Sequence, residues 1–380
     1  SGTSFEEIDT FIADQIKRLN IPGAALAIVE GDKITHLSGF GRARPGGEAP
    51  LPQTPFFIGS LTKSITALAV MQLVEAGRIE LDAPVQRYLP WFRVADPRAS
   101  AQMTVRHLLN QTSGLSVASG WIPLGDFDDR PDAGQRQARA LSTLKLARPA
   151  GSAFEYSNMN YNLLGLIIQS ASDETYEAYI EDHIFAPLEM RHSYTTPDKA
   201  KQNDLAAGHR YWFWFPTLTA AADLPLPRGS LPSGQLISCA GDMAHYLIAH
   251  LNEGRYGNVQ ILSPAGIADL HRPAVAAYEM GSQTGQYGMG WYNAIHGRER
   301  IVWHTGMVPD YVSYMALIPE QKKGVILLAN ADHFMMNPVI MEVGTGVASL
   351  LAGRQPAPRM FDFIPWLMRA LLFIPLLQIV

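Results

Sequence analysis

Ser60-Leu61-Thr62-Lys63 is the stretch that decides the fold of this 380-residue chain. An extended segment ending at Gly59 precedes it, and residues 64–76 after it carry apolar side chains at helical intervals. The spacing predicts a helix that begins at Ser60 and brings Ser60 and Lys63 to one face. A hydroxyl beside an amine is a nucleophile beside a possible base, and amides at a helix N-terminus favour a developing alkoxide. The motif therefore indicates a nucleophilic serine.

This motif is weak on its own, because Ser-x-x-Lys also occurs at Ser142-Thr143-Leu144-Lys145. That second copy lies in a polar, arginine-flanked run with no strand-like segment before it, so we interpret it as a solvated helix. Two further motifs strengthen the first copy, namely Tyr156-Ser157-Asn158 and His304-Thr305-Gly306. The latter ends a strand-like run over residues 300–303, where a side chain could be held against a cleft. Taken alone, His304 would be interpreted more simply as a structural histidine.

Together, the three motifs resemble those of the penicillin-recognising serine hydrolase superfamily. The resemblance is greatest to the class C β-lactamase-like branch, with its related family VIII carboxylesterases and D-aminopeptidases. Residues 108–115, 232–238 and 304–330 are also similar to segments of that branch. The resemblance extends over roughly residues 5–350 and so concerns the whole domain.

The resemblance implies an α/β (α+β) chain with a β-lactamase/penicillin-binding-protein-like fold. In that fold an antiparallel sheet is flanked by helices, and a mainly helical domain is inserted. Strand-like segments near both ends of the sequence must then share one sheet. We expect a serine hydrolase domain over residues 1–355, with an α/β part at about 1–60 and 255–355 and an inserted helical part at about 61–254. The site would lie at their interface, a common location for pockets.

The resemblance also assigns catalytic roles to three residues. Ser60 would attack the carbonyl of an ester or amide and become acylated. Free lysine has a pKa near ~10.4, so Lys63 must be desolvated or lie near another cation to accept a proton. Tyr156 is the other candidate base, and the sequence leaves open which of the two carries the proton.

The predicted substrate- and oxyanion-binding residues are Asn158, the motif His304-Thr305-Gly306 and Met307. Asn158 would contact the substrate or hold the lysine, with a purely structural cap as the alternative. By analogy, the amides of Ser60 and Met307 form the oxyanion hole, and glycine in the third motif permits close approach. The β-lactamases carry lysine where this chain has His304. Histidine is mostly neutral at pH 7, and it fits the esterase and peptidase relatives better.

Three tryptophans are candidates for the walls of a pocket. Trp212 and Trp214 belong to the aromatic run of residues 211–215, and Trp121 precedes the acidic run of residues 126–129. For the aromatic run three interpretations stay open: an apolar substrate pocket, a buried strand in the core, or a loop that dips into lipid.

Composition and the absence of certain motifs argue against several other classes of protein. A net charge of −5 gives no reason to expect nucleic acid as a partner, and the single cysteine, Cys239, excludes an internal disulfide. The sequence contains no His-Glu-x-x-His motif and no paired cysteines, so we predict neither a metal nor a cofactor. It also lacks the Gly-x-Ser-x-Gly elbow of Ser-His-Asp α/β-hydrolases.

The apolar C-terminal tail, residues 356–380, raises the question of membrane contact. Residues 361–380 nearly reach the length of a spanning helix, but Asp362, Arg369 and two prolines interrupt them. The segment could be an interfacial helix, the start of a membrane domain, or a helix packed on the domain. If it meets a bilayer, the family resemblance implies a bacterial protein whose catalytic domain faces the periplasm or the cell exterior.

The sequence thus predicts a serine hydrolase acting on a small-molecule or short-peptide ester or amide, most closely esterase-like or peptidase-like. The alternative is a β-lactamase, D,D-peptidase or penicillin-binding protein acting on cell-wall or D-amino-acid peptides. A non-catalytic scaffold that retains the fold is the alternative from another class. The sequence makes no prediction of oligomeric state.

Overall fold

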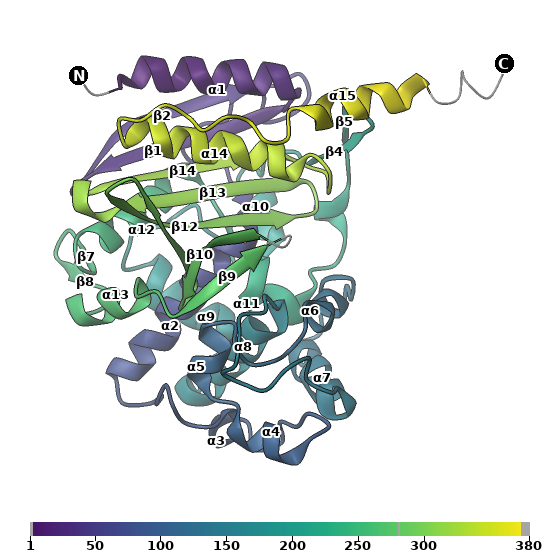
Figure 1. Cartoon of the computed structure of the whole chain (residues 1–380), viewed down its shortest axis with the longest axis vertical. Coiled ribbons are helices and arrows are strands. Elements are labelled where there is room, and N and C mark those ends of the chain that lie inside the picture. Colours follow the sequence, from purple (N-terminus) through teal and green to yellow (C-terminus); the bar gives the residue numbers. More distant parts are fainter. Residues whose placement is uncertain (1–2, 280–281, 374–380) are drawn as a thin grey trace.

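The computed structural model describes residues 3–279 and 282–373 of the chain. Its centre is an eight-stranded sheet in the order β2-β1-β14-β13-β12-β11-β10-β9, antiparallel at every pairing (Figure 1). The strands are β1 (Gly23–Glu30), β2 (Lys33–Gly41), β9 (Val275–Glu279), β10 (Ser282–Gly288), β11 (Trp291–His296), β12 (Glu299–Val308), β13 (Tyr311–Ile318) and β14 (Lys323–Ala329). The N-terminal strand β1 pairs with β14, with Ala24 opposite Ala329. Segments from both ends of the sequence therefore share one sheet.

Both faces of this sheet are buried, and β1 shows how. Ala25, Ala27 and Val29 contribute to one apolar core, and the alternate residues Leu26 and Ile28 contribute to the other. Helices α1 (Phe5–Leu19) and α14 (Asn337–Leu351) cover the second face, whereas α2 (Thr62–Glu75) and α12 (Ala240–Leu251) pack on the first (Figure 1). An alternation of this kind, without polar positions, is what a sheet covered on both sides requires.

The residues between β2 and β9 supply most of the helices beneath the sheet in Figure 1. They are α3 (Val85–Tyr88), α4 (Pro97–Gln102), α5 (Val105–Leu109), α6 (Val117–Leu124), α7 (Ala133–Ala140), α8 (Asn158–Ser172), α9 (Tyr176–Ile180), α10 (Pro197–Lys201), α11 (Leu231–Gly234) and α13 (Pro264–Leu270). Helix α2 contacts α8 and α11 as well as the sheet side of the core, and most of its residues are buried. It is the central helix of the molecule.

Helix α2 begins slightly later than the sequence predicted. Gly59–Leu61 form a turn of 3-10 helix, and regular α-helix starts at Thr62. The tighter turn follows from Gly59, whose φ of 54° is in the left-handed region. Ser60 therefore lies on the turn that leads into the helix, with Lys63 in the first helical turn.

A second, smaller sheet lies at the edge of the molecule. Strands β4 (His209–Trp212) and β5 (Phe215–Leu218) form a hairpin, and β4 also pairs in parallel with β15 (Ala331–Asp332). Helix α15 (Phe363–Ala370) follows α14 and lies near this hairpin in Figure 1. Within the described ranges, no helix has the length and apolar character needed to cross a bilayer. Residues 374–380 of the predicted tail lie outside the described residues.

Candidate active site

The side chain of Lys63 is the centre of the site. Its Nζ lies 2.9 Å from Ser60 Oγ and donates to Asn158 Oδ1 and to the carbonyl oxygen of Ser233, each at 2.7 Å. Ser60 and Lys63 come from the start of α2, Asn158 from the start of α8, and Ser233 from α11. Three segments that are far apart in the sequence thus meet at one amine.

Burial decides the protonation of this amine. Lys63 has no exposed surface, and desolvation holds its pKa well below the ordinary lysine value. A neutral amine has two N–H donors and one lone pair. The carbonyl of Ser233 and the amide oxygen of Asn158 can only accept, so they take both donors. The lone pair then faces the Ser60 hydroxyl, which can donate to it.

Tyr156 lies against the same amine. The centre of its ring is 4.8 Å from Lys63 Nζ and 6.3 Å from the imidazole of His304. Tyr156 is half-buried and precedes Ser157, the cap residue of α8. The structure therefore brings together the hydroxyl and the amine of the first motif and the aromatic ring of the second.

Gln111 positions the segment that carries Tyr156, and the sequence analysis missed it. The side-chain oxygen of Gln111 accepts from the Ser157 backbone N–H at 2.9 Å and from the amide of Asn160. Its backbone carbonyl accepts from the Glu155 N–H at 2.8 Å. Gln111 is fully buried, with a φ of 58°. The only signal for it was its place in the family-like segment 108–115, which does not name this side chain.

Strand β12 passes unusually close to the turn that carries Ser60. A Cβ built on Gly59 would lie 2.5 Å from the Met307 nitrogen, and one on Gly306 would lie 2.2 Å from the carbonyl oxygen of Ile58. Ser313 of β13 adds a hydrogen bond from its hydroxyl to that same oxygen, at 2.7 Å. Because no side chain fits between the two backbones, the Met307 amide lies next to the Gly59–Ser60 peptide. The amides of Ser60 and Met307, which we predicted as the oxyanion donors, therefore belong to neighbouring backbone segments.

His304 is buried among aromatic rings and does not act as a fixed positive charge. Its Nδ1 is 2.6 Å from the carbonyl oxygen of Thr305, and its Nε2 is 3.4 Å from the hydroxyl of Tyr287. Desolvation by burial is the main cause that lowers its pKa, to about 3. The imidazole is therefore neutral at pH 7, with Nδ1 donating to Thr305, which is itself half-buried.

Of the three tryptophans, Trp121 lies beside the site. It is 61% exposed on α6. The preceding residue, Gly120, packs so closely on α8 that an added Cβ would be 2.5 Å from the Asn158 nitrogen. Ser119 on the same helix lies within hydrogen-bonding distance of Ser157, at 3.2 Å between hydroxyl oxygens. Trp121 is thus held close to the Asn158 side of the site.

Trp214 lies elsewhere, and its prediction as a pocket wall is wrong. Its backbone oxygen accepts from Asn20 after α1, and its ring lies under the Arg369 guanidinium of α15 at 4.0 Å. It packs with the core of α1 and α14, on the face of the sheet opposite α2. Trp212 is on the same hairpin and is 72% exposed. A run of five aromatic residues does not reveal which face of a sheet it will meet.

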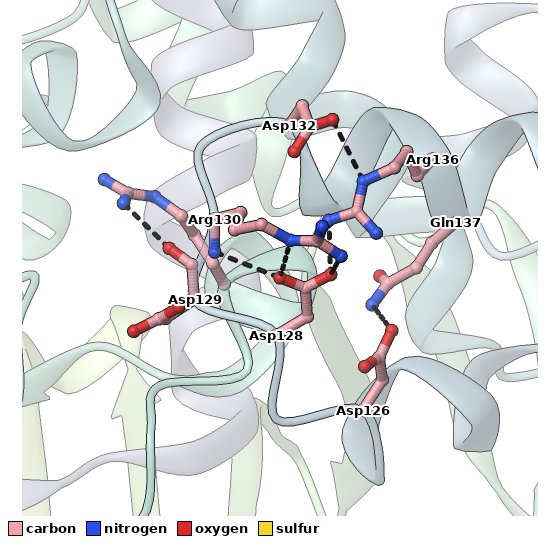
Figure 2. A network of polar contacts seen from close by, with 8 residues as sticks. Asp126, Asp128, Asp129, Arg130, Asp132, Arg136 and Gln137 are labelled. Atoms are coloured by element: carbon pink, nitrogen blue, oxygen red, sulfur yellow. Dashed lines mark hydrogen bonds and ion pairs between the residues drawn. The ribbon is translucent and has the colours of Figure 1, made fainter.

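The acidic run of residues 126–129 binds arginines. Arg130 and Arg136 both donate to the Asp128 carboxylate, and they hold its pKa far below the ordinary range (Figure 2). Arg136 also reaches Asp132, and Asp126 accepts from Gln137 (Figure 2). This network ties the loop after Trp121 to α7. Across residues 3–279 and 282–373, no group of histidine, cysteine or acidic side chains is arranged to hold a metal ion.

Comparison with known proteins places this geometry in a family. Residues 8–342 match the family described as Beta-lactamase. Protein flp of Staphylococcus aureus strain MW2 is 28% identical over 355 residues, which cover 92% of this chain and 68% of that protein. Penicillin-binding protein 4 of Amycolatopsis lactamdurans is 29% identical over 321 residues, covering 82% of this chain and 81% of that protein.

Solved structures show the same fold. The octameric penicillin-binding protein homologue from Pyrococcus abyssi superposes with a TM-score of 0.78 at 28% identity, over 93% of this chain and 78% of that one. The D-amino acid amidase from Ochrobactrum anthropi SV3, solved with L-phenylalanine amide, gives 0.70 at 25% identity, over 85% of this chain and 90% of that one. The chain has the β-lactamase-like fold and belongs to the beta-lactamase family, among serine hydrolases that act on esters and amides.

Proposed function

We propose that this protein cleaves an ester or amide bond through a covalent acyl-enzyme on Ser60. The observation that carries the proposal is the buried amine of Lys63, 2.9 Å from the Ser60 hydroxyl. Because burial lowers its pKa, the amine is available as an unprotonated base. Asn158 and the carbonyl of Ser233 hold it in place.

In the acylation step, Ser60 Oγ attacks the substrate carbonyl carbon and its proton passes to Lys63 Nζ. The oxyanion that forms is stabilised by the backbone N–H groups of Ser60 and Met307, worth roughly 3–4 kcal/mol per donor in comparable sites. As the tetrahedral intermediate collapses, the bond to the leaving group breaks. The phenol of Tyr156 gives its proton to the departing alcohol or amine.

In the deacylation step, the Tyr156 phenolate takes a proton from a water molecule, whose oxygen attacks the acyl carbonyl. The bond from the carbonyl carbon to Ser60 Oγ then breaks, and Lys63 returns the proton to the serine. Both bases are thereby restored.

The neutral state of His304 favours substrates without a carboxylate at that position. A lysine there would supply a fixed positive charge, whereas this imidazole is buried and uncharged at pH 7. We therefore infer an esterase-like or peptidase-like substrate, a small molecule or short peptide, with exposed Trp121 on one wall. A cell-wall or D-amino-acid peptide is the second candidate. The likeness to a penicillin-binding protein and to a D-amino acid amidase supports it.

A scaffold without activity is the alternative from another class, and Lys63 argues against it. A buried amine raises the free energy of the folded state unless it is paired. Within the described ranges no carboxylate forms an ion pair with Lys63. A scaffold would have no reason to retain this group beside a serine.

Intact-mass spectrometry with a fluorophosphonate and with penicillin G tests the proposal. Wild type should gain one adduct with the fluorophosphonate, and Ser60→Ala should gain none. Ser142→Ala, in the exposed second Ser-x-x-Lys copy, is the matched control and should react like wild type. Absence of any adduct on the wild type would support the scaffold. A comparison of the turnover of short p-nitrophenyl esters with the turnover of peptides ending in D-alanine then ranks the two substrate classes.

We also propose that residues 361–380 contact a membrane, with the catalytic residues on the periplasmic or external side. Exposed apolar side chains on α15 support the contact, and the curated relatives named above come from bacteria. The division into an α/β part and an inserted helical part likewise remains a proposal. Protease treatment of intact cells and of lysed cells would test on which side of the membrane the catalytic residues lie. Protection in intact cells and in membrane-enclosed spheroplasts, with cleavage after lysis, would contradict the proposal.

A further inference from the structure

An exposed apolar surface lies on the side of the sheet away from Ser60. We call it the hairpin–tail surface, and three segments build it. Its large exposed side chains are Trp212 and Phe215 of the β4–β5 hairpin, Phe334 after β15, and Met360, Phe363, Trp366 and Leu367 of the tail. Figure 1 shows β4, β5 and α15 together at one end of the molecule. Monomeric proteins rarely leave so many large apolar groups together in water.

The contacts between these segments make the surface continuous. Trp212 and Phe215 are cross-strand partners in the hairpin. Asp332 pairs with Arg210 in parallel register, so the chain that continues to Phe334 runs alongside the chain that continues to Trp212. Arg369 then joins the hairpin to α15, because its guanidinium lies 4.0 Å from the ring centre of Trp214 and 5.2 Å from that of Trp366.

Helix α15 is apolar on two sides. Ile364 and Met368 are buried in the core of α1 and α14. On the outward side, Phe363 is 61% exposed and Trp366 is 69% exposed. A helix on the surface of a water-soluble protein normally turns charged and polar residues outward. The outward side of α15 is therefore suited to a second apolar medium.

The chemistry of the surface fits a lipid interface. Tryptophan is enriched at membrane–water boundaries, and arginine can keep its charge at the headgroups while its stem lies along apolar rings. Among the described residues, Arg42 and Arg369 have no carboxylate within ion-pair distance. Arg42 lines a hollow with Pro216 and Leu218, on the face of the hairpin opposite Trp212 and Phe215. Of these two arginines, Arg369 is therefore the unpaired cation of the hairpin–tail surface, and in a chain with net charge −5 it is complementary to anionic headgroups.

We propose that the hairpin–tail surface docks on the interface of an anionic phospholipid bilayer, with α15 lying in the plane and the hairpin tip inserted beside it. The docking mode adds the β4–β5 hairpin and Phe334 to the membrane contact proposed above for residues 361–380. It also fixes the orientation of the protein on the membrane. The Ser60 turn, in the core on the opposite face of the sheet, points away from the lipid. The inference does not depend on the catalytic roles.

Co-sedimentation with vesicles of phosphatidylglycerol and phosphatidylcholine in equal parts tests the docking. We compare the whole chain with the double variant Trp212→Ser/Phe215→Ser. Trp121→Ser is the matched control, since it removes an equally large exposed indole from another part of the protein. Because two large apolar side chains would no longer enter the interface, the double variant should bind at least about tenfold more weakly. Trp121→Ser should bind like wild type.

Several outcomes would overturn the proposal. The proposal is wrong if the wild-type protein stays in the supernatant when the vesicles are pelleted. It is also wrong if the double variant binds the vesicles as well as wild type does. Wild type that forms dimers which the double variant loses, without binding vesicles, would assign the surface to a second copy of this chain. If binding is unchanged when phosphatidylcholine replaces all phosphatidylglycerol, the surface does not recognise anionic headgroups and that claim of the proposal is wrong. Circular dichroism of each variant verifies folding, which substitutions at exposed positions should preserve.

Discussion

Replacing Lys63 with methionine should separate the catalytic role of the amine from its effect on stability. Methionine has nearly the same length and fills the same space without a base. Activity should fall by about 10²–10⁴-fold, the usual contribution of a positioned general base. The same variant should gain stability relative to wild type as the pH falls, because wild type carries a buried group that protonates only when the chain unfolds.

The sign and size of that pH dependence follow from the lowered pKa of Lys63. Between the folded pKa and the ordinary value of 10.5, the unfolded state binds one more proton than the folded state. Wild-type stability then rises with pH by up to about 1.4 kcal/mol per pH unit, and the variant lacks this term. The loss of a donor to Asn158 and Ser233 costs about 1–3 kcal/mol for each acceptor at every pH. The slope of the difference, not its absolute value, is therefore diagnostic.

Urea denaturation of both proteins at several pH values from about 6 to about 9 measures the slope. Other titrating groups are common to the two proteins and cancel in the difference. Lys145→Met, in the exposed second copy of the motif, is the matched control and should keep full activity. A pH-independent difference between Lys63→Met and wild type would mean that the folded protein holds a charged ammonium. That result would refute the reasoning that makes Lys63 the base toward Ser60.

Three further predictions concern the framework of the site. Gly306→Ala should lower the free energy of unfolding by about 3 kcal/mol or more and abolish turnover, since its Cβ would overlap the Ile58 carbonyl oxygen; a urea melt like that of wild type would contradict the close approach. Gln111→Leu should cost about 1–3 kcal/mol for the buried Ser157 N–H alone, and kcat should fall more than KM rises; unchanged kinetics would show that Gln111 does not position the tyrosine. His304→Gln should make stability fall less steeply than in wild type as the pH drops from 6.5 towards about 3, because in that window only the unfolded chain protonates His304; parallel curves would show that the imidazole is charged in the folded state.

The convergence of Ser60, Lys63 and Tyr156 could be predicted in part from chemistry and in part from the family resemblance. A serine that must lose a proton needs a nearby base, and helical spacing supplies one three residues away. The sheet formed from both ends of the chain was predictable for a similar reason, since strands without neighbours must find partners. Family resemblance supplied the distant partners that spacing alone does not reach.

Other parts of the site could not be predicted, because neither a backbone carbonyl nor a buried supporting side chain forms a recognisable motif in the sequence. The carbonyl of Ser233 binds Lys63 through the backbone, and any residue has such a carbonyl. Gln111 acts through an unusual backbone conformation and three hydrogen bonds to a distant loop. Trp214 illustrates the opposite error, in which a conspicuous side chain attracted a functional interpretation before the face of the sheet was known.

The pairing of β1 with β14 has a consequence for the folding of the protein during its synthesis on the ribosome. The roughly 240 residues between Ser60 and His304 take on the order of 10 to 50 s to synthesise. During that time α2, buried on nearly every side in the finished molecule, has emerged without the strands that will cover it. A nascent chain released early would therefore carry the nucleophile on an exposed apolar helix, which chaperones and proteases recognise. It would also lack the strand that carries Met307, so it could not react.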